Sequence, residues 1–145
     1  MNTFRSNCSI GSALDHVGDK WSLLIVRDML IYQKYTFKDF ESSDESIATN
    51  ILSKRLKSLE ASGILSKHKL KVNKKTNVYL LTEKGYDLIH VLAGFVIWGD
   101  KYLKNDQPEM DDYQIGQTSS EIDTTIALIL SKYIEFRILQ LSACA

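Results

Sequence analysis

The fold is decided by the stretch from Ala48 to Ser62, which reads ATNILSKRLKSLEAS. At 100° per residue, Ala48, Leu52, Leu56 and Leu59 fall on one narrow stripe. This spacing predicts an amphipathic helix that turns the stripe toward a core. The opposite face is polar and basic, with side chains that can hydrogen-bond to an anionic partner: Thr49, Asn50, Ser53, Lys54 and Lys57.

A hairpin is expected after this helix. Gly63 is the residue type that commonly ends a helix. The period then changes to two, which predicts a strand that points His68, Leu70 and Val72 inward and Lys67, Lys69 and Lys71 outward. Residues 73–77 form a turn that carries Lys74 and Lys75, and Val78–Leu81 is the return strand.

Three helices are expected before the helix at 48–62. A short helix covers Ile10–Val17, and Asp19 caps a second helix, Lys20–Tyr32. The second helix has one apolar face made of Trp21, Leu24, Ile25 and Met29. Thr36 and Asp39 have the spacing of a capping box and open a short third helix, which Phe37 and Phe40 anchor to the core. The order helix, helix, turn, basic helix, basic hairpin is that of a winged helix-turn-helix. The fold class is therefore mainly α with a small β-hairpin (α+β).

Two longer helices and a linker are expected in the C-terminal part. Thr82 caps a helix from Glu83 to Lys104. Residues 105–119 form an acidic linker: six acids and no Lys or Arg lie between positions 105 and 125. Residues 120–142 form a helix that is apolar around much of its circumference, so it needs a partner, and a second subunit is the natural one. We expect three parts: a winged domain with its trailing dimerisation helix at 8–104, the linker at 105–119, and an extra dimerisation helix at 120–142.

The distribution of charge indicates the class of partner. The net charge is zero, but residues 50–82 hold eight Lys or Arg against the single acid Glu60. A basic surface on a neutral protein is typical of a protein that binds a polyanion. His16, His68 and His90 lack metal-ligand spacing and no phosphate-binding loop occurs, so we expect no enzyme, no catalytic residue, no metal and no cofactor.

The cellular compartment follows from the cysteines and the start of the chain. Cys8 and Cys144 lie at opposite ends, which is no disulfide framework and favours a reducing interior. We see no signal peptide and no apolar stretch long enough to span a bilayer. A cytoplasmic location without membrane partners is expected, with Cys144 as an exposed bystander.

Residues 8–103 resemble the HxlR-type family of winged helix-turn-helix regulators. The resemblance rests on ordered motifs: Cys8 followed by Ala13-Leu14, GDKWSLLI at 18–25, FKDF at 37–40, LSKRLKSLE at 52–60, GIL at 63–65, YLLTEKG at 79–85 and Trp98-Gly99. It implies a homodimeric transcription regulator on a palindromic operator, with 48–62 as recognition helix and 66–81 as wing. The sequence departs from the family pattern in three places: Ser9, Lys74-Lys75-Thr76 and the helix beyond Ser120.

Several residues keep two interpretations. Arg55 borders the core stripe and is either an ion-pair partner or a phosphate clamp. In some members of the family the N-terminal cysteine senses oxidants or electrophiles, which makes Cys8 a candidate sensor if Arg5 and the first helix lower its pKa. Otherwise Cys8 is a small apolar residue.

The leading hypothesis is a sequence-specific DNA-binding repressor, a homodimer on double-stranded DNA that a small molecule or electrophile can regulate. Its DNA contacts would be Thr49, Asn50, Ser53, Lys54, Lys57, Lys74 and Lys75. The alternative is a winged-helix interaction module that binds an acidic protein through its lysines.

Overall fold

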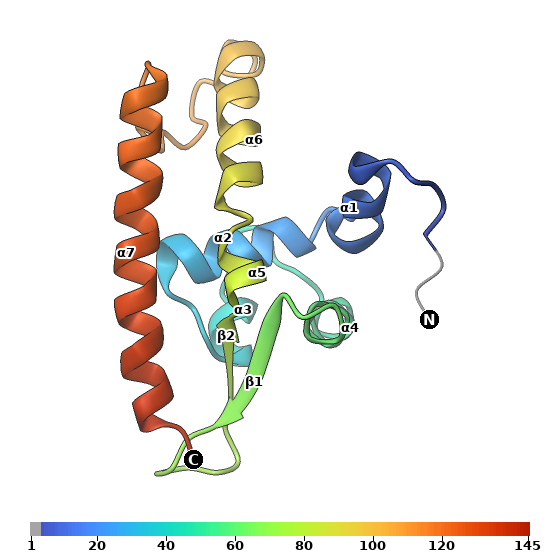
Figure 1. Ribbon diagram of the computed structural model, residues 1–145, viewed down its shortest axis with the longest axis vertical. Helices are drawn as coiled ribbons and strands as arrows, with labels where there is room; N and C mark the ends of the chain where they lie inside the picture. The colour runs from blue at the N-terminus through green and yellow to red at the C-terminus, as the bar shows by residue number, and fades with distance from the viewer. Residues whose placement is uncertain (1–3) are drawn as a thin grey trace.

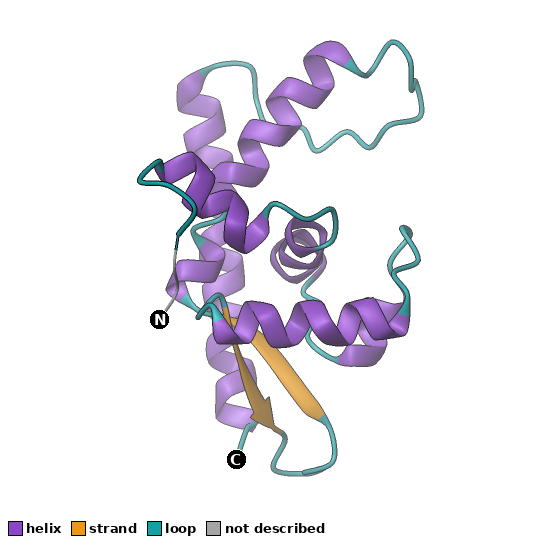
Figure 2. Cartoon of the chain, turned by 90° about the vertical axis from the view of Figure 1, so that its right-hand side faces the viewer, coloured by secondary structure: helices purple, strands orange, loops and turns teal. Residues whose placement is uncertain are grey.

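The protein is helical apart from one hairpin (Figures 1 and 2). The structure is a computed structural model that describes residues 4–145. Its elements are α1 (Ser9–Val17), α2 (Ser22–Tyr32), α3 (Phe37–Glu41), α4 (Thr49–Ala61), β1 (Leu65–Lys69), β2 (Asn77–Leu81), α5 (Glu83–Tyr86), α6 (Ile89–Tyr102) and α7 (Ser119–Ala143). The expected α+β fold class is thus confirmed.

The core lies between α2, α4 and the hairpin. Leu52, Leu56 and Leu59 are buried, as the stripe on α4 predicts. Ala48 is exposed, so its assignment to that stripe was wrong. It is the N-cap residue, with extended backbone at φ −63° and ψ 139°, and its side chain does not share the helical geometry. Ile47, one position earlier, is buried in its place.

Each residue predicted to cap a helix accepts hydrogen bonds from backbone amides near the start of that helix: Asp19 at α2, Thr36 at α3 and Thr82 at α5. The N-cap position of α2 is nevertheless Trp21. Thr36 and Asp39 form the capping box: the Asp39 amide donates to Thr36 Oγ1 at 3.2 Å, and the Thr36 amide donates to Asp39 Oδ2 at 3.0 Å. Asp39 also holds the chain before α3. Asp19 accepts hydrogen bonds from the amides of Trp21 and Ser22, each at 3.0 Å, and α2 begins at Ser22 rather than Lys20.

The hairpin is antiparallel, with Leu65 opposite Leu81 and Lys69 opposite Asn77. Val72 is 93% exposed, so the expectation that it points inward was wrong. The strand ends at Lys69, and the alternation of side chains ends with it. Gly63, at φ 73°, ends α4 in the left-handed conformation that glycine adopts without strain.

The helix expected over 83–104 is broken into α5 and α6 at Asp87 and Leu88. The amide of Leu88 donates to the carbonyl of Gly85, three residues back, so the α-helical pattern is interrupted there. Two large aromatic side chains of α6, Phe95 and Tyr102, are 61% and 56% exposed within this chain.

α7 runs along the length of the molecule and packs against α2 and α6 (Figure 1). Ile126 and Tyr133 are buried, so part of this helix belongs to the core of its own subunit. Cys144, expected to be exposed, is buried against Val78 and Leu80 of the hairpin. Within residues 4–145, none of the helices is long and apolar enough to cross a membrane.

Candidate nucleic-acid interface

α4 presents one face to solvent along its length. Thr49, Asn50, Lys54 and Lys57 are exposed, and Ser53 is half-buried. The buried leucines on the other side fix the rotation of α4 about its axis. Because they leave the polar face free, these five side chains can reach a partner without any rearrangement of the core.

Contacts at the middle and at the C-terminal end of α4 fix its position. Arg55 Nη1 lies 3.6 Å from Asp19 Oδ1, at the start of α2. Lys84 Nζ donates to the carbonyl of Ser62 at 2.7 Å, at the end of α4. The contact between Arg55 and Asp19 is the ion pair of the first interpretation of Arg55.

A partly buried ionic cluster holds the turn before α4. Arg27 donates from Nη1 to Glu45 at 2.6 Å and from Nη2 to Asp28 at 2.6 Å. Ser43 donates to the carboxylate of Asp28, which is 2% exposed. The hydrogen bond from Arg27 lowers the pKa of Glu45 to about 2. Sequence reasoning missed this cluster, although Arg27 and Asp28 within an apolar helix were a signal for it.

The hairpin adds a second exposed basic element beside α4. Lys74 and Lys75 are exposed in the connection between the strands, which the Lys75 amide stabilises by donating to Asn73 Oδ1 at 3.1 Å. Lys71 is different, because its Nζ donates to the carbonyl of Ser142 at 3.0 Å and so holds the C-terminus. Figure 2 shows α4 lying across the base of the hairpin, with the turn at the far end of the strands.

His68 on β1 has a hydrogen-bonding neighbour within its own strand. His68 Nε2 lies 2.8 Å from Ser66 Oγ and is half-buried, so it is a satisfied residue of the strand. Among residues 4–145, no group of three His, Cys, Asp or Glu side chains is arranged to hold a metal ion.

Cys8 is exposed at the N-cap position of α1. The backbone amides of Gly11 and Ile10 lower the pKa of its thiol. Arg5 does not supply the expected positive field, because its Nε is paired with Asp15 Oδ1 at 2.5 Å. The lowering of the Cys8 pKa therefore comes from the backbone amides at the start of α1.

Comparison with known proteins gives consistent matches. A model of the HxlR-like helix-turn-helix family matches residues 16–107. An uncharacterized HTH-type transcriptional regulator of Mycobacterium tuberculosis (strain H37Rv) is 33% identical over 95 residues, which cover 66% of this chain and 59% of that protein. The uncharacterized HTH-type transcriptional regulator YdeP of Bacillus subtilis is 30% identical over 95 residues, 66% of this chain and 73% of its own length. The chain thus spans less than two thirds of the mycobacterial relative.

Solved structures show the same similarity. The redox regulator HypR in its reduced form has a TM-score of 0.58 and 28% identity, covering 70% of this chain and 98% of HypR. The quinone-bound YodB of Bacillus subtilis has a TM-score of 0.53 and 28% identity, covering 66% of this chain and 99% of YodB. PA1607, proposed to be a transcription factor, has a TM-score of 0.66 and 30% identity over 80% of this chain and 78% of its own.

Proposed function

The chain belongs to the HxlR-like helix-turn-helix family, and on this premise we propose that it is a transcriptional regulator that binds double-stranded DNA as a homodimer. α4 is the recognition helix and the hairpin is the wing. The relatives named above are regulators and not enzymes, which supports this function. The proposed contacts are Thr49, Asn50, Ser53, Lys54, Lys57, Lys74 and Lys75.

The observation that carries the proposal is the exposed polar face of α4 on a helix that the core holds rigidly. A B-DNA major groove admits an α-helix and displays a distinct donor and acceptor pattern for each base pair. The Asn50 amide can pair with an adenine edge, and Lys54 can reach guanine. Lys57, Lys74 and Lys75 contact phosphates, which position the protein without reading sequence.

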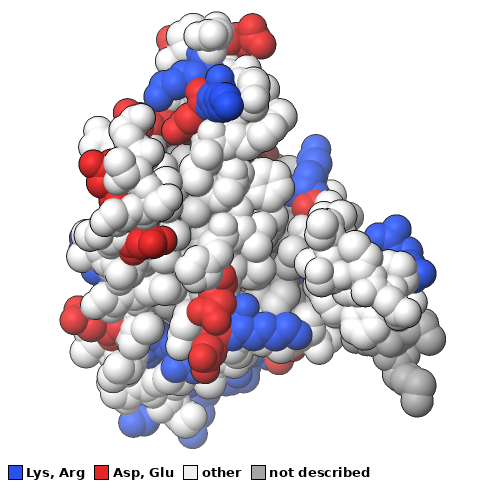
Figure 3. Space-filling model, turned by 45° about the horizontal axis from the view of Figure 1, so that its top comes forward, with Lys and Arg blue, Asp and Glu red and all other residues white. Residues whose placement is uncertain are grey.

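A second subunit is supported by the apolar side chains that this chain leaves uncovered. α6 exposes a stripe with helical spacing, made of Val91, Phe95, Trp98 and Tyr102, and we call it the α6 stripe. α7 exposes Leu128, Ile134, Ile138 and Leu139 on its outer side, the α7 stripe. Figure 3 shows wide areas without charged side chains on the face that it displays. Such surfaces mark interaction sites, and a two-fold dimer would cover them.

The two-fold axis sets the form of the DNA site. Two recognition helices would enter successive major grooves about 34 Å apart on a palindrome. We propose repression as the mode of action, because a dimer seated on promoter DNA blocks access to it.

DNA binding is tested with fluorescently labelled duplexes from upstream of the protein's own gene and with random duplex, across a range of salt. Affinity should fall with a log–log slope of about −0.9 per phosphate contacted. The double variant Lys74→Ala with Lys75→Ala should weaken binding to both duplexes equally. Asn50→Ala and Lys54→Ala should instead reduce the difference in binding free energy between the upstream duplex and the random duplex, by about 1–3 kcal/mol per lost bidentate base contact.

Two results would refute this function. Absence of DNA binding at low salt would favour the alternative function, in which the lysines of the hairpin bind an acidic protein partner. Equal losses on both duplexes for Asn50→Ala would mean that α4 contacts only the backbone.

We also propose that Cys8 senses oxidants or electrophiles. It combines exposure with a lowered thiol pKa, the two conditions for a reactive cysteine. Structures of the similar YodB include diamide-treated and quinone-bound forms. Diamide should therefore change DNA affinity in the native protein and in Cys144→Ala but not in Cys8→Ser. An equal response in Cys8→Ser would assign the chemistry elsewhere.

A further inference from the structure

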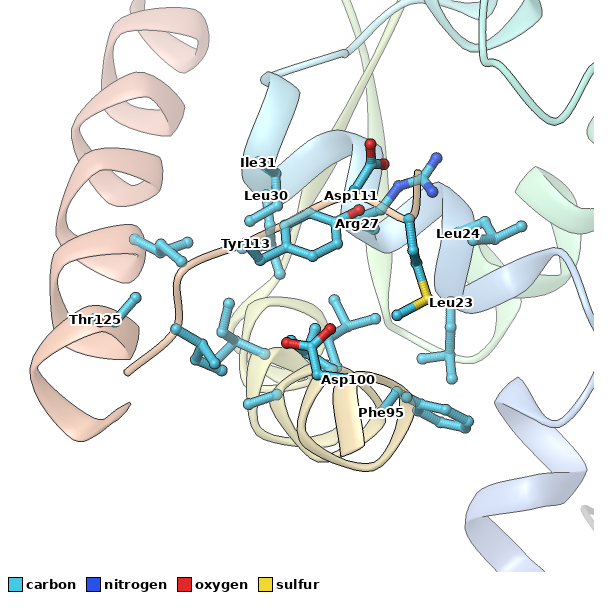
Figure 4. A pocket seen from close by; sticks show the side chains of 18 of the residues that line it. Leu23, Leu24, Arg27, Leu30, Ile31, Phe95, Asp100, Asp111, Tyr113 and Thr125 are labelled. Carbon is cyan, nitrogen blue, oxygen red and sulfur yellow. The ribbon is translucent and has the colours of Figure 1, made fainter. Parts of the chain in front are cut away.

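A cavity of about 790 Å³ lies between α2, α6, α7 and the segment 107–115 (Figure 4). Its walls are mainly apolar and include Leu30, Ile31, Leu92, Val96 and Ile129. This volume falls within the range of small-molecule sites, which are mostly apolar with a few polar groups. Of the α6 stripe, only Phe95 lines the cavity. A dimer formed through that stripe would therefore leave the cavity in place.

The charged groups around the cavity favour a cation. Arg27 lines it and is its most buried basic side chain, but Asp28 and Glu45 already neutralise that guanidinium. Lys20 and Lys132 are exposed and can turn to solvent. Asp100 is half-buried on α6 and, within residues 4–145, has neither an ion-pair nor a hydrogen-bond partner through its side chain. Figure 4 shows its carboxylate directed into the space between α6 and the linker.

From this arrangement we propose that the cavity binds a small organic cation with an apolar body. The apolar walls take the body, and the Asp100 carboxylate is the counterion. Asp111 and Glu109, at the rim, add negative potential along the entrance. A carboxylate beside apolar walls attracts a cation more strongly than it would in water, because the low local dielectric screens less.

Two ion pairs connect this cavity to the recognition helix. Asp19 lines the cavity and pairs with Arg55 on α4. Arg27 lines it too and pairs with Glu45, in the turn that leads into α4. A ligand that moves α2 therefore shifts α4. The ligand weakens or strengthens DNA binding according to the position of α2 to which it binds more tightly. This regulatory consequence rests on the proposed DNA-binding function, whereas cation binding does not.

Binding is tested by calorimetric titration of the full chain with tetraphenylphosphonium, and separately with tetraphenylborate, which has nearly the same shape and the opposite charge. The phosphonium should bind at least tenfold more tightly than the borate. Asp100→Asn should reduce phosphonium affinity at least tenfold and leave borate affinity unchanged or increased. Asp123→Asn, an exposed acid on α7 outside the cavity, is the matched control and should bind as the native chain does.

Three results would overturn the proposal. Equal binding of both ions would show an apolar site without charge selection. Loss of affinity in Asp123→Asn equal to that in Asp100→Asn would show a general charge effect. Absence of binding by either ion would show that the space is closed in solution, for example by a second copy of the chain.

The consequence for DNA is measured separately, by titrating duplex DNA with and without saturating tetraphenylphosphonium. A change in DNA affinity of fivefold or more in the native chain, absent in Asp100→Asn, supports the coupling. Unchanged DNA affinity with the phosphonium bound would refute the regulatory role. If DNA does not bind at all, the proposed function fails while the calorimetric result still decides the cavity.

Discussion

Gly85 lies where the backbone of α5 approaches the segment between α4 and β1. A Cβ atom at this position would lie 2.0 Å from the carbonyl oxygen of Ile64 and 3.0 Å from Leu81 Cδ2. The carbonyl belongs to the backbone and cannot turn away as a flexible side chain could. The glycine is therefore required by the close approach of two chain segments.

We expect Gly85→Ala to lower the free energy of unfolding by about 2 kcal/mol, because the added methyl overpacks this contact. Urea denaturation followed by circular dichroism measures the change. Gly94→Ala is the control: nothing lies within 4 Å of its Cβ position, and alanine in a helix gains up to about 1 kcal/mol over glycine. Equal stability of the two variants would contradict the contact.

Glu45 links stability to pH. The hydrogen bond from Arg27 lowers its pKa to about 2 from an ordinary value of 4.5. A carboxyl whose pKa is lower in the folded state stabilises that state fully above pH 4.5, and this contribution is lost as pH falls toward 2. Since its side chain is 34% exposed, solvent screening limits the contribution to about 1 kcal/mol.

Glu45→Gln should therefore destabilise the protein at pH 7 and have little effect near pH 2. The measurement is a series of denaturation curves between these pH values, with Glu41→Gln as the exposed control. A constant difference at every pH would mean that the ion pair does not supply the stability.

At the scale of elements, α7 supplies hydrogen bonds to the backbone of the β1–β2 hairpin. The Leu81 amide donates to the hydroxyl of Tyr133 at 2.7 Å, and Arg137 Nε donates to the Leu81 carbonyl at 2.8 Å. The C-terminal residues reach the other end of the hairpin, where the Ala145 amide donates to the Lys69 carbonyl at 2.8 Å. The helix expected to serve dimerisation also satisfies backbone groups of the hairpin.

Tyr133→Phe tests this role. It leaves the ring in place and removes the acceptor of a buried amide, which should cost about 1–3 kcal/mol. The Leu81 amide should also exchange its hydrogen faster, as measured by NMR. Tyr102→Phe, on the exposed α6 stripe, is the control. Unchanged exchange at Leu81 in Tyr133→Phe would show that the hydroxyl is not its partner.

At the scale of the whole molecule, the exposed α6 and α7 stripes are the surfaces through which the proposed dimer would form. Deleting residues 120–145 should weaken the dimer or cause aggregation, but it also removes Ile126 and Tyr133, which are buried in the core of the subunit. Point substitutions separate these effects, because Trp98 and Ile138 are 58% and 60% exposed and do not hold the subunit together.

We expect Trp98→Lys and Ile138→Lys each to shift the chain toward monomer in sedimentation equilibrium, with unchanged circular dichroism. Burial of a large apolar side chain contributes about 1.5–3 kcal/mol to the free energy of association. In a two-fold dimer each substitution occurs once in each subunit, so its effect is doubled. Ser58→Lys, on α4, should leave the association unchanged. If only one stripe variant dissociates, that helix alone forms the interface. A native chain that is monomeric at micromolar concentration would exclude the dimer.

The sequence by itself determined the elements whose cause is local. The spacing of Leu52, Leu56 and Leu59 gave the orientation of α4, and the Thr36–Asp39 capping box gave the start of α3. Gly63 marked the end of α4. Each of these signals lies within a few residues of its effect, where side-chain periodicity and hydrogen-bonding geometry act directly. The ordered motifs then identified the family.

The tertiary structure alone decided the contacts between distant segments. Cys144 lies against the hairpin, Arg27 binds Glu45 across the turn before α4, and Asp100 faces a cavity that four separate segments enclose. The close approach of Gly85 to the carbonyl of Ile64 is likewise a contact between segments that are distant in the sequence. These pairings depend on how packed helices bring together residues far apart in the chain. The period of one helix determines which of its faces is apolar, but only packing determines what that face meets.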